Sequence, residues 1–341
     1  MSAPPPLLEV TDLRTVFHTA RGDVRAVDGV SFALAAGETL GLVGESGSGK
    51  SVLGRTVMGL IGSGPTTTVT GRVRLGDHDV HALRPSARRR LWGPEVAMVF
   101  QDPMTSLNPV KRVGTHLTET LRQHLRCSRA EAAERAVDLL RQVGIPEPAR
   151  RLRQYPHELS GGMRQRVVIA TALACDPRLL IADEPTTALD VTVQKQILDL
   201  LGSLVAERDM AMQLVSHDLV AVAGRTDRVQ VMYAGRTVES GATPSVFAAP
   251  EHPYTEALLA SIPQLAHPPH TVLRAIEGNP PDMARPPAGC RFAPRCSRVR
   301  EDCTEVLPAL AVVPAEARRE VACHHPVGST PLRLEEVGRG R

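Results

Sequence analysis

Aromatic residues, lysine and long apolar runs are all scarce in this chain of 341 residues. Phe, Trp and Tyr make up 3% of it, which leaves little for stacking on the bases of single-stranded nucleic acid. A net charge of +3 gives equally weak support to a nucleic-acid partner, and we expect none. No apolar run approaches the roughly 20 residues that cross a bilayer, and no secretory signal is recognisable. We therefore expect a cytoplasmic protein with reduced thiols and no transmembrane segment of its own.

Lysine occurs only at positions 50, 111 and 195, against an abundance of arginine. Lys50 stands in "GESGSGKS", Gly44–Ser51, which follows the short apolar segment Thr39–Val43 and matches G-x-x-x-x-G-K-[ST]. Glycines at these positions let backbone N–H groups turn inward around a β-phosphate. The pattern predicts that Lys50 reaches the β- and γ-phosphates and that the Ser51 hydroxyl ligates Mg²⁺.

Acidic and polar residues follow other apolar segments at the points where strands of a sheet would end. "LLIADEP" ends in Asp183, which suits Mg²⁺ coordination, and Glu184, which suits a general base for the attacking water. Gln101 and His217 also stand directly after apolar segments. Because ligands of α/β sheets bind at the carboxyl ends of the strands, Gln101 can contact Mg²⁺ or the water, and His217 the γ-phosphate.

A second turn of small residues, Ser160-Gly161-Gly162, leads into a strongly helical stretch. Helix starts present bare N–H groups and a positive dipole end, so this turn also predicts an anion site. Phe17, one of five phenylalanines, stands near the end of a predicted strand. Its ring can stack on adenine or pack in the core, and both alternatives stay open.

Alternating strands and helices predict an α/β fold with a mainly parallel sheet. Residues Asp102 to about His157 indicate a helical insertion, and the composition after Ala249 indicates a separate Pro- and Arg-rich C-terminal module. The predicted strands are Leu7–Phe17, Ala26–Leu34, Thr39–Val43, Gly71–Leu75, Val96–Phe100, Leu179–Asp183, Ala211–Ser216 and Arg228–Tyr233, and the predicted helices are Ser51–Leu60, Arg112–Arg126, Ala130–Val143, Gly161–Ala174 and Val191–Glu207.

Four of the six cysteines lie in the C-terminal module, at Cys290, Cys296, Cys303 and Cys323. Four thiols in a short segment of a cytoplasmic protein favour metal ligation over disulfides. Thiolates can hold tetrahedral Zn²⁺ or an iron–sulfur cluster, and the absence of a C-x2-C pair weakens the zinc-ribbon interpretation. Unrelated buried cysteines remain the alternative.

These motifs, in this order, resemble the nucleotide-binding subunit of ABC transporters over about residues 7–250. The glycine loop looks like its Walker A, "LLIADEP" its Walker B with the catalytic glutamate, Gln101 its Q-loop and His217 its switch histidine. "LSGGMRQ", Leu159–Gln165, is similar to the signature loop, with Met163 where many members have Gln, and "ALD" ending at Asp190 is similar to the D-loop.

The resemblance implies a P-loop NTPase with a RecA-like core, an antiparallel β subdomain and a helical subdomain at about residues 102–165, all within a nucleotide-binding domain of residues 1–250, followed by a module of residues 251–341. It implies that two subunits sandwich two ATP molecules head to tail, with Lys50, Glu184 and His217 acting in hydrolysis. The implied contacts to the chain's own ATP are Phe17, Gly44, Glu45, Ser46, Gly47, Ser48, Gly49, Lys50, Ser51, Val52, Gln101 and His217; those to Mg²⁺ are Ser51, Gln101 and Asp183; and those to the partner's ATP are Ser160, Gly161, Gly162, Gln165 and Asp190.

"HPYT…LL" followed by "GCRFAPRC" resembles the oligopeptide/dipeptide branch of ABC importers, as does "VFQDPMTSLNP", Val99–Pro109. This branch associates the four tail cysteines with a four-iron four-sulfur cluster, zinc being the alternative. It implies a second, non-identical ATPase subunit, two transmembrane permeases and an extracytoplasmic peptide-binding protein, with the chain attached peripherally to the cytoplasmic face of the membrane. Nickel or another small solute remains open as the cargo. A soluble ABC ATPase would need a second cassette or a coiled coil, and a P-loop kinase would leave Ser160–Gln165 without a task.

Overall fold

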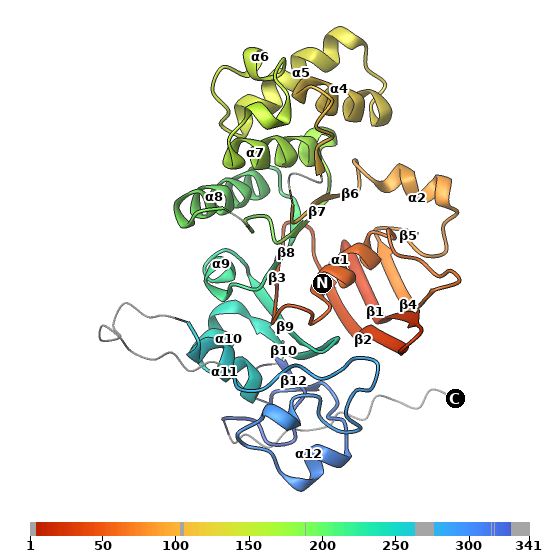
Figure 1. Ribbon diagram of the computed structural model, residues 1–341, viewed down its shortest axis with the longest axis vertical. Coiled ribbons are helices and arrows are strands. Elements are labelled where there is room, and N and C mark those ends of the chain that lie inside the picture. Colours follow the sequence, from red (N-terminus) through yellow and green to blue (C-terminus); the bar gives the residue numbers. More distant parts are fainter. Residues whose placement is uncertain are drawn as a thin grey trace. The chain divides into compact units, whose positions relative to one another are not determined.

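The computed structural model describes residues 5–102, 106–187, 189–262, 276–314, 316 and 318–328 (Figure 1). The chain divides into two compact units, and each is described by itself. The first consists of Met1–Glu9, Ala33–Thr39 and Val73–Val215, and the second of Val10–Phe32, Leu40–Arg72 and Ser216–Arg341. The chain therefore crosses from one unit to the other several times.

Three parallel strands form the centre of the first unit: β6 (Val96–Val99), β7 (Leu179–Asp183) and β8 (Ala211–Ser216). Val96 pairs with Leu179, and Leu179 with Ala211. Every residue of these strands is buried, as expected for parallel strands that are covered on both faces. The carboxyl ends of these parallel strands lie at the same edge of the sheet, so the polar residues that follow the strands also lie at that edge.

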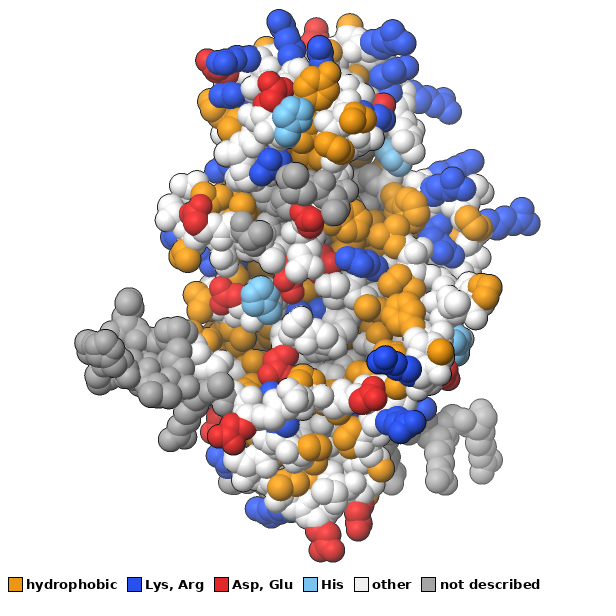
Figure 2. All heavy atoms as spheres, in the orientation of Figure 1, with side chains coloured by type: hydrophobic (Ala, Val, Ile, Leu, Met, Phe, Trp, Pro, Cys, Tyr) orange, Lys and Arg blue, Asp and Glu red, His pale blue; other side chains and the backbone are white. Residues whose placement is uncertain are grey.

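Helices make up most of the rest of the first unit: α4 (Val113–His124), α5 (Arg129–Gln142), α6 (Pro148–Arg151), η1 (Pro156–Glu158), α7 (Gly161–Ala172), η2 (Leu173–Cys175) and α8 (Val191–Glu207). A capping box between Ser128 and Glu131 starts α5, because each side chain accepts the other residue's backbone N–H. Figure 2 shows blue Lys and Arg side chains gathered where Figure 1 places α4, α5 and α6. The exposed arginines there include Arg122, Arg129, Arg135, Arg141 and Arg150.

Two groups of strands form the second unit. β1 (Leu8–Thr19) lies between β2 (Gly22–Leu34) and β4 (Thr67–Leu75). The end of β4 pairs with β5 (His78–Asp79), ahead of α2 (Pro85–Leu91) in the first unit. In the other group β3 (Thr39–Val43), which leads to α1 (Lys50–Val57), pairs in parallel with β9 (Arg228–Tyr233).

The C-terminal segment continues this second group of strands. β9 pairs antiparallel with β10 (Arg236–Ala242), β10 with β12 (Glu320–Val321), and β12 with β11 (Ala311–Val312). The helices are α9 (Leu219–Val222), α10 (Thr243–Ala248), α11 (Pro253–Ala260), η3 (Ala293–Arg295) and α12 (Glu301–Glu305). The cysteine-bearing segment is therefore tied to the rest of the second unit through backbone pairing.

The expected α/β class is confirmed, and β3, β7, β8, β9 and α8 have the predicted bounds. The sequence did not predict β10, because its central Val-Glu-Ser-Gly has no apolar alternation although the strand is buried. Among the described residues, no helix is long and apolar enough to cross a membrane.

Candidate nucleotide and cysteine sites

The glycine loop between β3 and α1 has the backbone conformation that its sequence predicts. Gly44, Gly47 and Gly49 have φ of 149°, 80° and 101°, a region that side-chain-bearing residues rarely enter. A Cβ on Gly44 would lie 2.1 Å from the Met232 carbonyl oxygen, and one on Gly49 2.1 Å from that of Ala26. Beside Gly47 there is open space instead. The loop is thus packed tightly at its two ends and open at its middle, a cradle that suits a phosphate.

Lys50, the first residue of α1, folds back over this loop. Its Nζ donates hydrogen bonds to the carbonyl oxygens of Gly44 and Glu45, both at 2.8 Å, and to Ser48 Oγ at 3.3 Å. The residue is 4% exposed, so its charge lies inside the loop rather than in solvent. Gly49 caps α1 without a side-chain hydrogen bond, so no side chain at the cap position competes with an anion for this end of the helix. The donors here fit the phosphates of a nucleotide.

At the other expected catalytic position, Glu184 follows β7 in a left-handed conformation with φ of 47°. A residue other than glycine is held there at a cost of about 1–3 kcal/mol, and such conformations concentrate at functional sites. Glu184 N–H donates to the Val215 carbonyl at 3.0 Å. Gln101 Nε2 and Thr187 Oγ1 each donate to Glu184 Oε2 at 3.0 Å. The carboxylate is therefore aimed by its backbone and by two side chains.

The structure brings Gln101 and Glu184 into direct contact, although 83 residues separate them in the sequence. Asp183, the last residue of β7, directly precedes Glu184 in the chain and is fully buried. These three residues belong to the first unit, whereas Lys50 and His217 belong to the second. The joint action of the two groups on one nucleotide stays a prediction.

The second predicted anion site lies at the start of α7. Ser160 caps this helix, with its Oγ accepting from Met163 N–H at 3.3 Å, and it is exposed. Asp190 is also exposed and caps α8 through Val193 N–H at 2.9 Å. These polar groups are at the protein surface, as a contact with another subunit requires.

Gly162 and Gln165 have local packing roles that the sequence did not indicate. A Cβ on Gly162 would lie 2.8 Å from Val193 Cγ1, whereas one on Gly161 would meet Leu189 at an ordinary 3.5 Å. Gly162 therefore allows α7 to approach α8. Gln165 is 1% exposed, and its Nε2 has no hydrogen-bond partner among the described residues. Its predicted contact with a partner's ATP would need this side chain to leave the interior.

Phe17 and His217 are both accessible in the second unit. Phe17, near the end of β1, is half-buried, so its ring is not enclosed in the core. His217 is exposed directly after β8, where the next residue, Asp218, caps α9. Pro103–Thr105 of the segment Val99–Pro109, and Ala188 of the ALD segment, lie outside the described residues.

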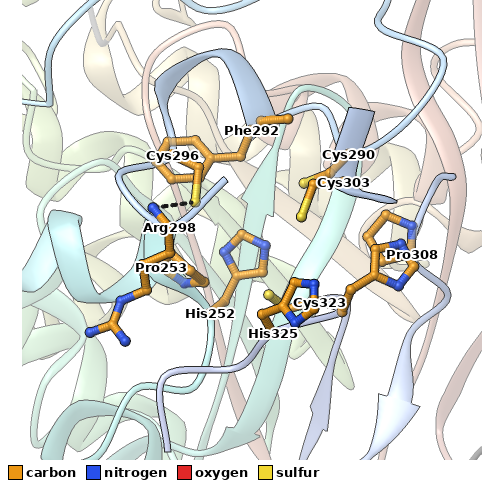
Figure 3. Close-up of a pocket in the computed structure, with 12 residues that line it drawn as sticks. His252, Pro253, Cys290, Phe292, Cys296, Arg298, Cys303, Pro308, Cys323 and His325 are labelled. Carbon is orange, nitrogen blue, oxygen red and sulfur yellow. Dashed lines mark hydrogen bonds between the residues drawn. The ribbon is translucent and has the colours of Figure 1, made fainter. Parts of the chain in front are cut away.

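The four tail cysteines line one small cavity, and all six cysteines of the chain are free thiols (Figure 3). Cys290 precedes η3, Cys296 ends it, Cys303 lies in α12 and Cys323 follows β12. Cys290 N–H donates to the Cys303 carbonyl at 2.8 Å. A Cβ on Gly289 would lie 2.4 Å from that oxygen, so only glycine lets these two segments meet.

Burial favours the neutral form of three of the cavity thiols. It raises the pKa of Cys290 and Cys296, and that of Cys323 to about 12. A Cys₄ zinc site with Zn–S bonds of 2.3 Å needs sulfurs roughly 3.8 Å apart. In the described part of the chain, the three-ligand group within 4.8 Å is instead Asp302, Cys303 and His325. No three of the four cysteine sulfurs lie within 4.8 Å of one another, which is a wider spacing than a single zinc ion requires.

The two histidines that follow Cys323 in the chain both have polar contacts. His325 Nε2 contacts the Asp302 carboxylate at 2.8 Å, and His324 Nε2 lies 3.0 Å from the Val306 carbonyl oxygen. His252, which also lines the cavity, is 1% exposed, and burial lowers its pKa to about 3. Its Nδ1 accepts from Tyr254 N–H at 3.0 Å, so the imidazole is a neutral cap of α11.

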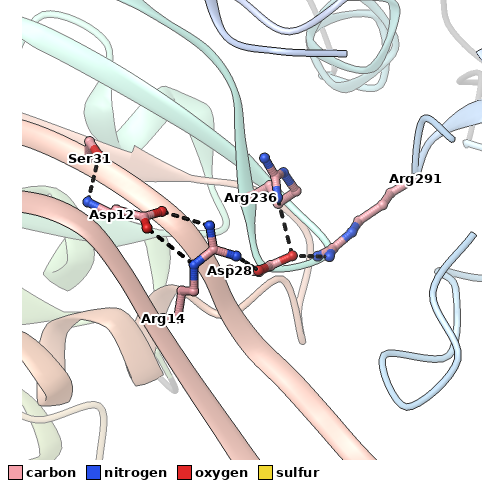
Figure 4. Close-up of polar contacts among 6 residues, drawn as sticks. All are labelled: Asp12, Arg14, Asp28, Ser31, Arg236 and Arg291. Carbon is pink, nitrogen blue, oxygen red and sulfur yellow. Dashed lines mark hydrogen bonds and ion pairs between the residues drawn. The ribbon is translucent and has the colours of Figure 1, made fainter. Parts of the chain in front are cut away.

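The second unit holds a buried charge cluster that no sequence pattern indicates. Asp28 is 5% exposed and accepts from Arg14 at 2.7 Å, from Arg236 at 3.2 Å and from Arg291 (Figure 4). Burial alone would raise the pKa of Asp28, but the three guanidinium charges outweigh it and lower the pKa. These residues come from β1, β2, β10 and the cysteine-bearing segment, so only the folded chain brings them together.

Comparison with known proteins matches two successive parts of the chain to known families. The profile of the family described as "ABC transporter" matches residues 27–187, and that described as "Oligopeptide/dipeptide transporter, C-terminal region" matches residues 238–303. The oligopeptide transport ATP-binding protein OppD of Escherichia coli K12 is 50% identical over 327 residues, 94% of each chain. The dipeptide transport ATP-binding protein DppD of the same organism is 46% identical over 98% of each chain.

A solved structure of the ATP-binding cassette MJ0796, a dimer in a post-hydrolysis state bound to ADP and Pi, has the same fold. It is 26% identical, with a TM-score of 0.63, and the match covers 69% of this chain and 98% of that one. The expected P-loop NTPase fold is confirmed. With the relatives matched over nearly their full length, the chain belongs to the ABC transporter family, in its oligopeptide/dipeptide branch, and it is an ATPase of that family.

Proposed function

We propose that this chain is the ATP-hydrolysing subunit of an importer for short peptides. The observation that carries the proposal is that one chain joins a tight phosphate loop with a buried Lys50 to the C-terminal region of the oligopeptide/dipeptide family. The relatives named for oligopeptide and dipeptide transport match both parts. The division into a nucleotide-binding domain of residues 1–250 and a module of residues 251–341 is part of this proposal.

The proposed nucleotide site assigns a role to each predicted residue. Phe17 stacks on adenine, the loop Gly44–Val52 binds the phosphates, and Ser51, Gln101 and Asp183 hold magnesium. Mg²⁺, when bound, neutralises charge on the phosphate oxygens. Glu184 orients the attacking water and accepts its proton, and its contacts with Gln101 and Thr187 support that geometry. His217 contacts the γ-phosphate.

Hydrolysis, in this proposal, is completed by a second subunit. Ser160, Gly161, Gly162, Gln165 and Asp190 face the ATP of the partner, which accounts for a second anion site far from the phosphate loop. The exposure of Ser160 and Asp190 and the dimeric state of the MJ0796 structure support this arrangement. Splitting the site between two chains makes hydrolysis conditional on their closure.

The proposed assembly has a second, non-identical ATPase subunit, two transmembrane permeases and an extracytoplasmic peptide-binding protein. The chain would attach peripherally at the cytoplasmic face. The helical insertion, with its exposed arginines on α4 to α6, is the part proposed to contact the permeases (Figure 2).

The transport proposal is tested in proteoliposomes that hold the full complex. We expect uptake of a labelled tripeptide that requires ATP and is lost with Lys50→Ala. The matched control is Lys195→Ala, because Lys195 forms an exposed ion pair with Asp199 on α8, outside the loop. ATP-driven uptake of nickel but not of peptides would overturn the peptide assignment, and full ATPase activity of the single chain that is indifferent to permeases would overturn transport itself.

For the tail we propose that Cys290, Cys296, Cys303 and Cys323 hold a four-iron four-sulfur cluster. Their shared cavity and their spacing support it over a single zinc ion. Anaerobically purified full-length protein should contain about four irons and four inorganic sulfides per chain and absorb near 400 nm. Both signals should fall with Cys296→Ser and persist with Cys127→Ser, which lies outside the cavity. Stoichiometric zinc without sulfide would contradict the cluster.

A further inference from the structure

The short loop between Cys290 and Cys296 carries two arginines, Arg291 and Arg295, neither of which lines the cysteine cavity. Arg291 is 6% exposed, and the Arg295 side chain is 4% exposed, so both charges are removed from solvent. A buried guanidinium needs a fixed counter-charge, because an unpaired buried charge is strongly unfavourable. The acidic residues that pair with these two arginines therefore show which parts of the chain the loop binds.

Arg295 holds a residue of the phosphate loop. Its Nη1 donates to Glu45 Oε2 at 2.7 Å, and its Nη2 donates to Glu45 Oε1 at 3.0 Å. Such a two-point pair fixes orientation as well as distance. The guanidinium lies 5.9 Å from the centre of the Tyr233 ring, and its Nε donates to the Glu277 carbonyl at 2.9 Å. Arg295 is thus itself held in one place.

Glu45 is constrained through three of its groups. Its carboxylate is bound by Arg295, its backbone N–H donates to Tyr254 Oη at 2.8 Å, and its carbonyl accepts from Lys50 Nζ at 2.8 Å. The position of Glu45 therefore sets the position of a carbonyl that directs the Lys50 ammonium group. This arrangement gives the Glu45 side chain a task inside the chain, besides any contact with nucleotide.

Arg291 stabilises the turn at Ala234 and Gly235, which contacts the phosphate loop. It donates to the Ala234 carbonyl and pairs with Asp28 (Figure 4). The next residue, Gly235, donates its N–H to the Ser48 carbonyl at 2.9 Å and accepts from Asp28 N–H at 2.8 Å. The turn at Ala234 and Gly235 is thereby fixed against the phosphate loop.

We propose that Arg295 is a positioning residue for the phosphate loop: by binding Glu45 it holds the loop and Lys50 ready for the phosphates of ATP. The inference rests on the proposed role of Gly44–Val52 as the phosphate-binding loop. A loop that is already ordered loses less entropy when the ligand binds, so its affinity is higher. Through Arg295, the loop between two cysteines of the C-terminal module contributes to nucleotide binding.

The test measures the binding of Mg-ATP, Mg-ADP and adenosine to the purified full-length chain. Arg295→Met keeps the length of the side chain and removes its charge, and we expect it to raise the Kd for ATP and ADP about tenfold, or ~1.4 kcal/mol. The Kd for adenosine, which lacks phosphates, should stay unchanged. Arg298→Ala is the matched control, because Arg298 forms an exposed ion pair with Glu256, which lies outside the phosphate loop.

A double-mutant cycle separates this role from a general loss of stability. If Arg295 acts through Glu45, then Arg295→Met with Glu45→Gln should bind ATP no more weakly than the weaker-binding single variant. Arg295→Lys, which keeps one charge, should have an intermediate Kd and provides the measurement if Arg295→Met does not fold.

Equal ATP affinity in folded Arg295→Met or Arg295→Lys and wild type, additive effects in the cycle, or an equal loss for adenosine would overturn the inference. Failure of the proposed function looks different: the wild type would then not bind Mg-ATP, or Lys50→Ala would bind it as well as wild type does.

Discussion

Two residues illustrate how differently single positions are constrained in this chain. Glu184 is held in a left-handed backbone conformation that a glycine would adopt without strain, yet a carboxylate stands there. Gly162 has no such backbone constraint, and its missing side chain makes room for Val193 of α8. In the proposed function the first position needs its carboxylate for chemistry, whereas the second needs its small size for packing, although both belong to motifs of the same family.

Replacing Glu184 with Gln should separate binding from hydrolysis. The amide keeps the size of the side chain and can still contact Gln101, but it cannot accept a proton from water. We expect ATP hydrolysis by the assembled complex to fall at least about 100-fold, while Mg-ATP still binds. Single-turnover assays and nucleotide retention measure both quantities. Glu207→Gln, at the exposed end of α8, is the control, and unimpaired hydrolysis by Glu184→Gln would refute the assignment of the base.

The packing role of Gly162 predicts a loss of stability that its neighbour does not share. A methyl group at Gly162 would lie 2.8 Å from Val193 Cγ1, so either α7 or the stiff Val193 side chain must shift. We expect Gly162→Ala to be about 1–3 kcal/mol less stable than Gly161→Ala in urea unfolding. Adding Val193→Ala should recover most of the difference. Equal stability of the two single variants would contradict this account.

At the scale of elements, the residues of the proposed sites lie mainly at helix starts. α1 receives the glycine loop, α7 and α8 present Ser160 and Asp190, and α11 begins at His252 beside the cysteine cavity. The first three starts were predicted, because glycine, serine and aspartate announce them. The fourth was not, since a histidine cap gives no such signal.

The buried cap of α11 predicts a pH dependence of stability. His252 has a pKa of about 3 in the folded chain and about 6.5 when unfolded. The unfolded state therefore binds one more proton between these values, and stability is lost as the pH falls below about 6.5. We expect the free energy of unfolding to drop by ~1.4 kcal/mol per pH unit there from this residue alone.

His252→Asn should weaken that dependence, because its side-chain oxygen can replace Nδ1 as the acceptor for Tyr254 without titrating. Urea midpoints at pH 7 and pH 5 measure the change in slope. His78→Asn, at an exposed position of β5, is the control. If His252→Asn and the wild type lose the same stability between these pH values, the buried neutral histidine is not the source.

At the scale of the whole molecule, the chain carries parts of two proposed sites that serve different nucleotides. ATP hydrolysis by the isolated chain should therefore depend on association. We expect activity per chain to fall at least tenfold on dilution from micromolar to nanomolar concentration, since a bimolecular contact is lost at concentrations well below its Kd.

Substitution at the surface of α7 tests the same idea at fixed concentration. Ser160→Arg should abolish most hydrolysis while leaving nucleotide binding intact, because the proposed contact is with the partner's ATP. Ser203→Arg, at an exposed position of α8, is the control. Full activity of a monodisperse single chain carrying Ser160→Arg would show that the site is complete without a companion.

The fold class, the phosphate loop and the family could all be predicted from the amino-acid sequence, because each depends on local spacing. Glycines at fixed intervals, an acid after an apolar strand and a serine before a helix can be recognised without knowing which elements pack against one another. The bounds of β7, β8 and β9 were predicted for the same reason, since they are short apolar runs between polar segments.

Three features depend on how the chain folds: Arg295 binds Glu45, three arginines share Asp28, and four cysteines of irregular spacing line one cavity. These contacts join segments up to 263 residues apart. No local pattern encodes them, because a salt bridge depends on where the backbone brings two side chains and not on the residues beside either one.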